Sequence, residues 1–334
     1  MAVCPDSISV IICAHTEERF DYLVEAIESV KHQTVLAQEI IVVIDHNIKL
    51  LQRIKSQTSD VIIVENSGAR GLADARNTGI ATATSTLVAF LDDDAKASLS
   101  WLENLCAGFN DPCVIGAGGV LTPLWEGQEQ TWLPAEFYWV VGCTYRGMPQ
   151  TVTSIRNPIG ANMVFRRKIF DEIGVFRIGL IGSRLIYCDE TELCIRARQM
   201  LPGSIFLHQP QANVFHHVPA KRTTWKYFCS RCYAEGVSKA MITRMTRGNS
   251  SLTPERTYVF RTLPLGILRG LADGLLHYDF TGWARAIAII TGLFTVVVAY
   301  IISNINYYIS HDKKHAIHEE VPQKLEQLFS NKAC

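Results

Sequence analysis

The chain has 334 residues, enough for one large domain or for a domain with an appendage. Lys plus Arg and Asp plus Glu both number 32, so the formal net charge is zero and the basic excess that nucleic-acid binding usually leaves is missing. We therefore expect no nucleic-acid partner. The 10 Cys are scattered and lack the spacing of a disulfide framework. This pattern favours reduced thiols and a cytoplasmic location for the part of the chain that contains them.

The first third of the chain alternates between expected strands and helices. Apolar runs predict strands at residues 7–12, 39–45, 60–65 and 86–91, and helices are expected between them at residues 20–33 and 72–83. This α/β order is typical of a mostly parallel central sheet covered by helices. The apolar segment near residue 10 has no basic region before it, so we interpret it as the first strand and not as a signal peptide.

Three adjacent carboxylates, Asp92, Asp93 and Asp94, follow the fourth expected strand directly. Adjacent carboxylates repel one another unless a cation joins them. Mg²⁺ and Mn²⁺ take oxygen ligands and commonly bind through one or two carboxylates together with substrate phosphates. The triplet therefore indicates a metal that carries a nucleotide diphosphate. A solvated acidic turn is the alternative, since Asp is also an ordinary turn residue.

Polar residues stand at the ends of three of the four expected strands: His15 with Thr16, Asp45, and the aspartate triplet. In such sheets ligands bind at the carboxyl ends of the strands, so this convergence favours the metal interpretation. The glycine-rich dinucleotide motif and the phosphate loop are both absent from the sequence, which counts against a nicotinamide-dependent oxidoreductase and a phosphate-loop nucleotidase. Arg70 or Arg76 could face a pyrophosphate through its planar fork of donors, with a surface salt bridge as the alternative.

The carboxyl-terminal part of the sequence differs in kind. Residues 286–303 form an apolar run near the lower length limit for crossing the hydrocarbon core. Within residues 241–283, leucines and isoleucines recur at helical spacing among charged residues, which is typical of amphipathic helices at a membrane interface. We expect a transmembrane or membrane-embedded helix at residues 284–305 and a polar tail at residues 306–334. A buried helical hairpin of a soluble domain is the alternative.

Several motifs occur together in the order and approximate spacing of a known family. They are Asp45, Arg76 with Asn77, the aspartate triplet, residues 160–167, and residues 189–193. Over residues 7–240 the chain resembles the family 2 glycosyltransferases, which have the A-type nucleotide-sugar fold, GT-A-like and related to the Rossmann fold. Residues 134–139 and 146–149 resemble the archaeal glucosyl-dolichyl-phosphate glucuronosyltransferase type more closely.

The resemblance implies one domain with a donor-binding half at residues 1–120 and an acceptor and catalytic half at residues 121–240. The implied donor is a nucleoside diphosphate sugar, more specifically a UDP-sugar. The residues implied to bind it are Cys13, Asp45, Arg76, Asp92 and Asp93, with Cys13 and Asp45 contacting the uracil. The implied ligands of a Mg²⁺ or Mn²⁺ ion are Asp94, Asp92 and His216. A structural histidine after a strand is the alternative for His216.

The family chemistry requires a base. Direct inversion at the anomeric carbon needs a group that takes the acceptor hydroxyl proton, and the resemblance implies Glu190 or Asp189. The usual family order is Glu-Asp, whereas this chain has Asp189-Glu190, which leaves the choice between the neighbours open. A carboxylate in the first turn of a helix is stabilised in its ionised form, so we expect a base that is deprotonated at neutral pH and acts through its placement. The alternative is that these two carboxylates only cap the helix and take no part in proton transfer.

The resemblance thus implies an inverting, metal-dependent hexosyl- or glucuronosyltransferase, and the cysteine pattern favours a cytoplasmic catalytic domain. The Gln-x-x-Arg-Trp motif of polymer-forming members is absent, which favours transfer of a single sugar. The expected acceptor is membrane-bound, such as a lipid-linked saccharide in polysaccharide or glycoconjugate assembly. A polyprenyl phosphate or a soluble acceptor is the second hypothesis, and a catalytically silent, nucleotide-sugar-binding membrane scaffold is the third. Arg231 and Lys239 are expected two helical turns apart, on nearly one face of a helix. There they would contact a lipid phosphate or a donor pyrophosphate, or remain solvated charges.

Overall fold

The computed structural model describes residues 7–177, 189–245 and 256–330, with only the helical backbone described at 310–330. In these residues a 9-stranded sheet has the order β3-β2-β1-β4-β8-β6-β9-β5, and β7 pairs with β9. The strands are β1 (Ile8–Ala14), β2 (Glu39–Asp45), β3 (Ile62–Asn66), β4 (Leu87–Asp92), β5 (Ala95–Ala97), β6 (Val114–Trp125), β7 (Thr153–Ile155), β8 (Asn162–Arg166) and β9 (Ile205–Val218).

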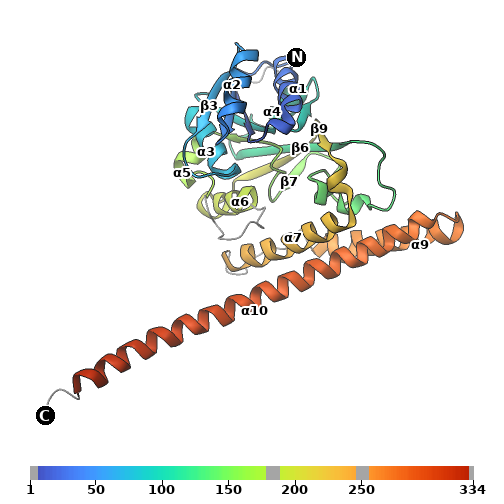
Figure 1. Cartoon of the computed structure of the whole chain (residues 1–334). Helices are drawn as coiled ribbons and strands as arrows, with labels where there is room; N and C mark the ends of the chain where they lie inside the picture. Colours follow the sequence, from blue (N-terminus) through green and yellow to red (C-terminus); the bar gives the residue numbers. More distant parts are fainter. Residues whose placement is uncertain (1–6, 178–188, 246–255, 331–334) are drawn as a thin grey trace.

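Helices lie on both faces of the sheet and along one side of it (Figure 1). The α-helices are α1 (Phe20–Lys31), α2 (Ile48–Gln57), α3 (Leu72–Thr82), α4 (Trp101–Cys106), α5 (Lys168–Ile173), α6 (Asp189–Met200), α7 (Trp225–Met245), α9 (Leu263–Leu276) and α10 (Phe280–Ser330). The short helical turns are η1 (Glu17–Arg19), η2 (Ala135–Val141), η3 (Ala220–Thr223) and the π-helical η4 (Tyr258–Thr262).

The amino-terminal half has the predicted α/β architecture. β3, β2, β1 and β4 are parallel neighbours, and each matches an expected strand. β1, β2 and β4 are nearly continuous apolar runs because both faces of the sheet are covered there, whereas β3 at the edge is partly exposed. In β1, for example, Val10 and Ile12 belong to a core shared with α1, α2 and α4, whereas Ile11 belongs to a core shared with α3, α5 and α6. The α/β fold with helices on a central sheet is confirmed.

The second half makes the sheet mixed. β8 runs antiparallel to both β4 and β6, and the long β9 pairs parallel with β6 and antiparallel with β5 and β7. Two register positions matter for the site. Cys13 of β1 lies opposite Asp92 of β4, and Ala95 of β5 lies opposite His216 of β9. The second pairing brings the aspartate triplet beside a histidine that is distant in the sequence.

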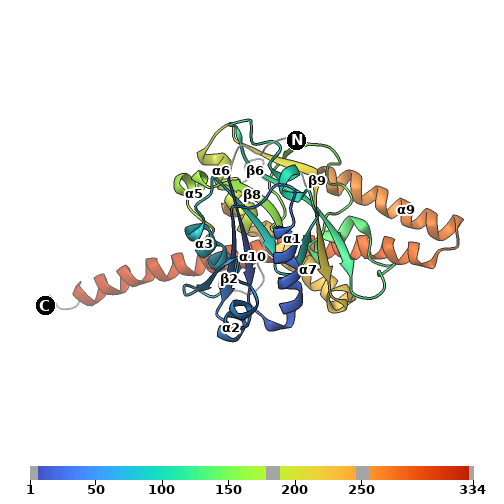
Figure 2. The same ribbon diagram turned by 90° about the horizontal axis from the view of Figure 1, so that it is seen from above.

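A layer of helices lies along one side of the sheet domain. α7 packs along α10, and α9 and α10 form a helical hairpin, as Figure 1 shows. Seen from above, α10 extends past the domain (Figure 2). A third apolar core joins this layer to η2, with Phe137, Phe228, Leu263 and Ile289 buried in it. The hairpin is therefore attached to the domain through a packed interface.

The expected apolar helix lies within α10. Among the described residues it is the one helix long and apolar enough to cross a membrane. The candidate span is Phe280–Ile309, and its most apolar 18-residue window has a mean hydropathy of 2.4. The amphipathic helix expected before it is α9, while residues 246–255 of the same predicted region lie outside the described part of the chain. The division into a donor half and an acceptor half stays a prediction.

Candidate functional site

Asp92, Asp94 and His216 come together beyond the carboxyl end of β4. One ligand atom of each residue lies within 4.8 Å of the others. Nε2 of His216 lies 3.3 Å from Oδ1 of Asp94. Asp94 leads into β5, whose antiparallel pairing with β9 positions the imidazole. Two carboxylates and an imidazole offer oxygen and nitrogen donors suited to a divalent ion such as Mn²⁺, so the donor set fits the predicted metal.

Asp94 is buried among positive groups. Its Oδ2 lies 3.0 Å from Nη1 of Arg19 and 3.5 Å from Nη2 of Arg222. Burial by itself raises the pKa of Asp94, but the hydrogen bond with His216 and the charges of His216, Arg19 and Arg222 outweigh it and hold the pKa below its ordinary value. Burial likewise opposes the charge on His216, yet the bond to Asp94 raises the pKa of His216 to about 10. A divalent cation would compete with the proton on this imidazole.

The other two aspartates of the triplet face different partners. Oδ1 of Asp92 lies 3.8 Å from Nη2 of Arg76, and burial raises the pKa of Asp92 although the charge of Arg76 lowers it in part. Asp93 is buried and accepts a hydrogen bond of 2.9 Å from Nη1 of Arg19. Burial and the neighbouring Asp94 carboxylate raise the pKa of Asp93 to about 7. Asp93 thus points toward η1, while Asp92 faces the cavity described below.

Asp45 and Cys13 lie at the ends of neighbouring strands. Asp45 accepts hydrogen bonds from the backbone N–H of Gly71 at 3.0 Å and from Nδ2 of Asn66 at 2.8 Å, and Nδ1 of His46 lies 2.8 Å away. These bonds outweigh burial and lower the pKa of Asp45. Burial raises the pKa of the Cys13 thiol to about 12. Neither residue is in the wall of the cavity, and their contacts with a nucleotide base stay predictions.

A cavity of about 990 Å³ extends from the predicted metal ligands to the helical layer. Its polar end includes Asp92, His216, Arg70, Arg76 and Arg156. Its other end is apolar, and α10 supplies much of that wall through Leu293, Val296, Val297 and Tyr300. A single space therefore connects a site suited to a charged nucleotide with a surface suited to hydrocarbon.

Both candidate bases line this cavity from the first turn of α6. The prediction of a base with an ordinary, low pKa is wrong. Burial raises the pKa of Glu190 to about 7 against the opposing charge of Arg76, and it also raises the pKa of Asp189. The amino-terminal end of the helix lowers the pKa of these carboxylates less than the loss of solvent raises it. A group with a pKa near neutrality is well matched to accepting and releasing a proton at that pH.

α7 adds charged groups to the wall between the two ends. Arg231, Glu235 and Lys239 line the cavity, and Nζ of Lys239 lies 3.0 Å from Oε1 of Glu235. Sequence reasoning missed Arg19 and Arg222, which surround Asp94. Arg19 comes from η1, and Arg222 from η3 beyond β9, and no motif in the sequence marks either residue.

A family model and a curated relative point to the same family of proteins. The family model described as Glycosyl transferase family 2 matches residues 9–174. The glucosyl-dolichyl phosphate glucuronosyltransferase of Haloferax volcanii is 32% identical over an alignment of 241 residues, and the alignment covers 70% of this chain and 77% of the relative. The match to this relative is longer than the donor half predicted for residues 1–120.

Solved structures show the same fold at low identity. The mannosyltransferase PcManGT of Pyrobaculum calidifontis, solved with GDP-Man and Mn²⁺, aligns with a TM-score of 0.55 and 16% identity over 90% of this chain and 87% of the other. GalNAc-T7, solved with UDP, GalNAc and Mn²⁺, aligns with a TM-score of 0.51 and 15% identity over 77% of this chain. The present chain spans 56% of that longer chain. These neighbours support the GT-A-like architecture.

Proposed function

Because the chain belongs to glycosyltransferase family 2, we propose that it transfers a single sugar from a UDP-sugar to a lipid-linked saccharide at a membrane, with inversion at the anomeric carbon. One observation carries this proposal. The same cavity contains Asp92 and His216 of the metal group, the carboxylates of Asp189 and Glu190, and an apolar wall from α10. A donor with a charged diphosphate and an acceptor with a hydrocarbon chain would each find suitable surroundings there.

The donor would occupy the polar end. Asp92, Asp94 and His216 would hold Mg²⁺ or Mn²⁺, which would supply positive charge where the diphosphate leaves. Arg76 is held in place by a hydrogen bond of 3.2 Å to the carbonyl of Gly160, and its guanidinium faces the cavity where it would contact the pyrophosphate. Asp45 stays ionised at neutral pH because its pKa is lowered, so it would accept the N3–H of a uracil.

The acceptor hydroxyl would approach from the side of α6. Glu190 would take its proton as the C–O bond forms at the anomeric carbon and the bond to the diphosphate breaks on the opposite face. A pKa of about 7 leaves a large share of Glu190 deprotonated at neutral pH while it still binds the transferred proton well. We assign the role to Glu190 rather than Asp189 because the family resemblance implies that the second of the two acids, here Glu190, is the usual base.

The lipid part of the acceptor would occupy the apolar end, between α7 and α10. The relative from Haloferax volcanii is named for a dolichyl phosphate substrate, which combines a phosphate with a long apolar chain. Arg231 and Lys239 border the route from Glu190 to Val296 and Val297, so they would contact the acceptor phosphate. An acceptor without a lipid would leave this apolar wall without a ligand.

The proposal is tested by transfer assays with the full-length protein in detergent or nanodiscs. UDP-sugars and GDP-sugars are offered with Mn²⁺ or with EDTA, and with a lipid-linked saccharide, a polyprenyl phosphate or a soluble saccharide as acceptor. We expect one UDP-sugar to be consumed in a metal-dependent reaction that adds one sugar of inverted configuration to the lipid-linked saccharide. Nucleotide binding without turnover on any acceptor would support the scaffold hypothesis, and a product of retained configuration would contradict the mechanism.

A further inference from the structure

α10 carries a stripe of large apolar side chains that the described part of the chain leaves open to solvent. We define the apolar stripe by its members, which are each 45–67% exposed: Ile287, Ile290, Phe294, Val297, Ile301 and Ile305. They follow one another at steps of three or four residues and so share one face of the helix. No Asp, Glu, Lys or Arg occurs between Arg285 and Asp312 in the sequence. A continuous exposed surface of this kind marks a binding face and is uncommon on soluble monomers.

The opposite face of α10 is packed against the rest of the protein. A Cβ at Gly236 of α7 would meet the carbonyl oxygen of Val296 and lie 2.7 Å from Cβ of Ala299, so the two helices touch at their backbones. Further along, Nη1 of Arg244 donates to Oδ1 of Asn304 at 3.0 Å. α7 therefore accompanies α10 over most of the apolar run and brings charged groups with it.

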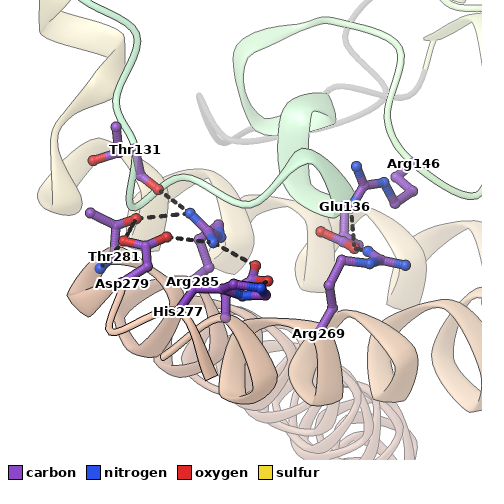
Figure 3. Close-up of polar contacts among 9 residues, drawn as sticks. Thr131, Glu136, Arg146, Arg269, His277, Asp279, Thr281 and Arg285 are labelled. Carbon is purple, nitrogen blue, oxygen red and sulfur yellow. Dashed lines mark hydrogen bonds and ion pairs between the residues drawn. The ribbon is translucent and has the colours of Figure 1, made fainter. Parts of the chain in front are cut away.

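The charged groups of the α9–α10 hairpin bind one another or the catalytic domain, as Figure 3 shows. Arg285 donates to Asp273 at 2.8 Å, to Asp279 at 3.1 Å and to the backbone carbonyl of Thr131 at 3.3 Å. Arg269 donates at 2.7 Å to the buried carboxylate of Glu136 on η2. These contacts fix the rotation of the hairpin, so that the apolar stripe faces away from the packed interface.

This arrangement is incompatible with a helix that crosses the bilayer alone. If residues 286–303 spanned the hydrocarbon core, α7 would enter it with Glu235, Lys239 and Arg244, and charged side chains are strongly disfavoured there. Beyond Asn304 α10 continues to Ser330, but residues 312–320 include five charged residues, so this part of the helix lacks the apolar run of about 20 residues that a span requires. The apolar stripe itself runs for about 27 Å, enough to lie along a membrane surface.

We propose that α10 lies in the plane of one leaflet of a phospholipid bilayer, with the apolar stripe among the acyl chains, and does not cross to the other side. A leaflet is favoured over a second copy of this chain because Val297 belongs both to the stripe and to the wall of the cavity. A second copy on the stripe would cover that border, whereas a leaflet makes the apolar end of the cavity continuous with lipid. The proposal concerns placement and is independent of which sugar is transferred.

The first test is topology. Epitope tags at the amino and carboxyl ends of the full-length chain are probed with protease in sealed vesicles of both orientations. An in-plane α10 leaves both tags on the same side of the membrane, and both are digested together in one vesicle orientation. Tags that are digested in opposite orientations would show that the helix crosses the bilayer and would overturn the proposal.

The second test measures vesicle binding. Full-length protein diluted from detergent is floated with phosphatidylcholine vesicles, and we expect binding that persists at about 0.5 M salt because the stripe carries no charge. The double variant Phe294→Glu with Ile301→Glu should float at least about tenfold less. Asn306→Glu is the matched control, since Asn306 is exposed but lies about 140° round the helix from Ile301. It should float like the parent.

Two further measurements, of thermal unfolding and of oligomeric state, make the vesicle test decisive. Thermal unfolding of all variants is compared, because the stripe is exposed and the double substitution should leave the melting temperature unchanged. The oligomeric state in detergent is measured in parallel. A double variant that floats like the parent would overturn the proposal, and if it also turned a dimer into a monomer, the occupant of the stripe would be a second copy of the chain.

Discussion

The two ends of the cavity are built in different ways. The polar end rests on strand ends and the loops that follow them, where β4, β5 and β9 fix Asp92, Asp94 and His216 through backbone pairing. The apolar end is made by helices, and its shape depends on how closely α7 and α10 approach. Damage at the polar end should therefore abolish chemistry, whereas damage at the apolar end should alter recognition of the acceptor and leave the donor reaction intact.

The largest effect is expected from Asp94→Asn. The substitution removes the carboxylate that contacts His216, Arg19 and Arg222, and leaves the positive groups without their common partner. Metal-dependent sugar transfer should fall about a thousandfold, measured with saturating donor over a range of Mn²⁺ concentrations. Asp93→Asn should cost no more than about tenfold, because Asp93 faces Arg19. Transfer at the parent rate by the Asp94→Asn variant would disprove the metal site.

Glu190→Gln should lower transfer about a hundredfold or more at pH 8 while nucleotide binding persists. The pH profile is the sharper measurement. A base acts in its deprotonated form, so with a pKa of about 7 the parent rate should rise between pH 6 and pH 8 and then level off. Replacement by Gln should abolish this rise. If Asp189→Asn loses the rise and Glu190→Gln keeps it, the base is Asp189.

The polar end was largely predictable from the sequence because its residues follow strands. Once apolar runs locate the parallel strands, Asp45 and Asp92 must lie at the same edge of the sheet. His216 needed more information, since its meeting with Asp94 depends on the pairing of β5 with β9. The pKa of Glu190 was not predictable, because burial is a property of the whole fold and outweighs the local effect of the helix end.

The apolar end was predictable in kind and not in detail. Periodicity indicated amphipathic helices and an apolar run, yet both faces of α10 are apolar, so the sequence did not show which face is packed. Gly236 of α7 and Gly292 of α10 determine which face of α10 is packed. A Cβ at either position would clash with the neighbouring element at the present spacing. The glycines stand in the sequence, but their partners, such as Phe137 of η2, become visible only in the fold.

A moderate effect is expected from Arg231→Gln. If the cation contacts the acceptor phosphate, the KM for a lipid-linked acceptor should rise about tenfold, which corresponds to ~1.4 kcal/mol. The metal-dependent hydrolysis of the donor in the absence of acceptor should stay at the parent level. Lys226→Gln is the matched control, since Lys226 is exposed on the same helix and is not in the cavity wall. A change in donor hydrolysis equal to the change in acceptor KM would place Arg231 at the donor end.

The smallest effect is expected from Gly236→Ala, which tests the helix contact itself. Alanine gains about 1 kcal/mol in helix propensity, but its Cβ would meet the backbone of α10, and such overpacking costs about 1–3 kcal/mol. The net loss of stability should be about 1 kcal/mol, seen as a small drop in melting temperature. The displaced α10 should raise the acceptor KM a few-fold and leave donor hydrolysis unchanged, while Ser230→Ala at an exposed site on α7 should change neither. If the melting temperature drops but the acceptor KM is unchanged, the contact between α7 and α10 stabilises the fold and does not shape the acceptor site.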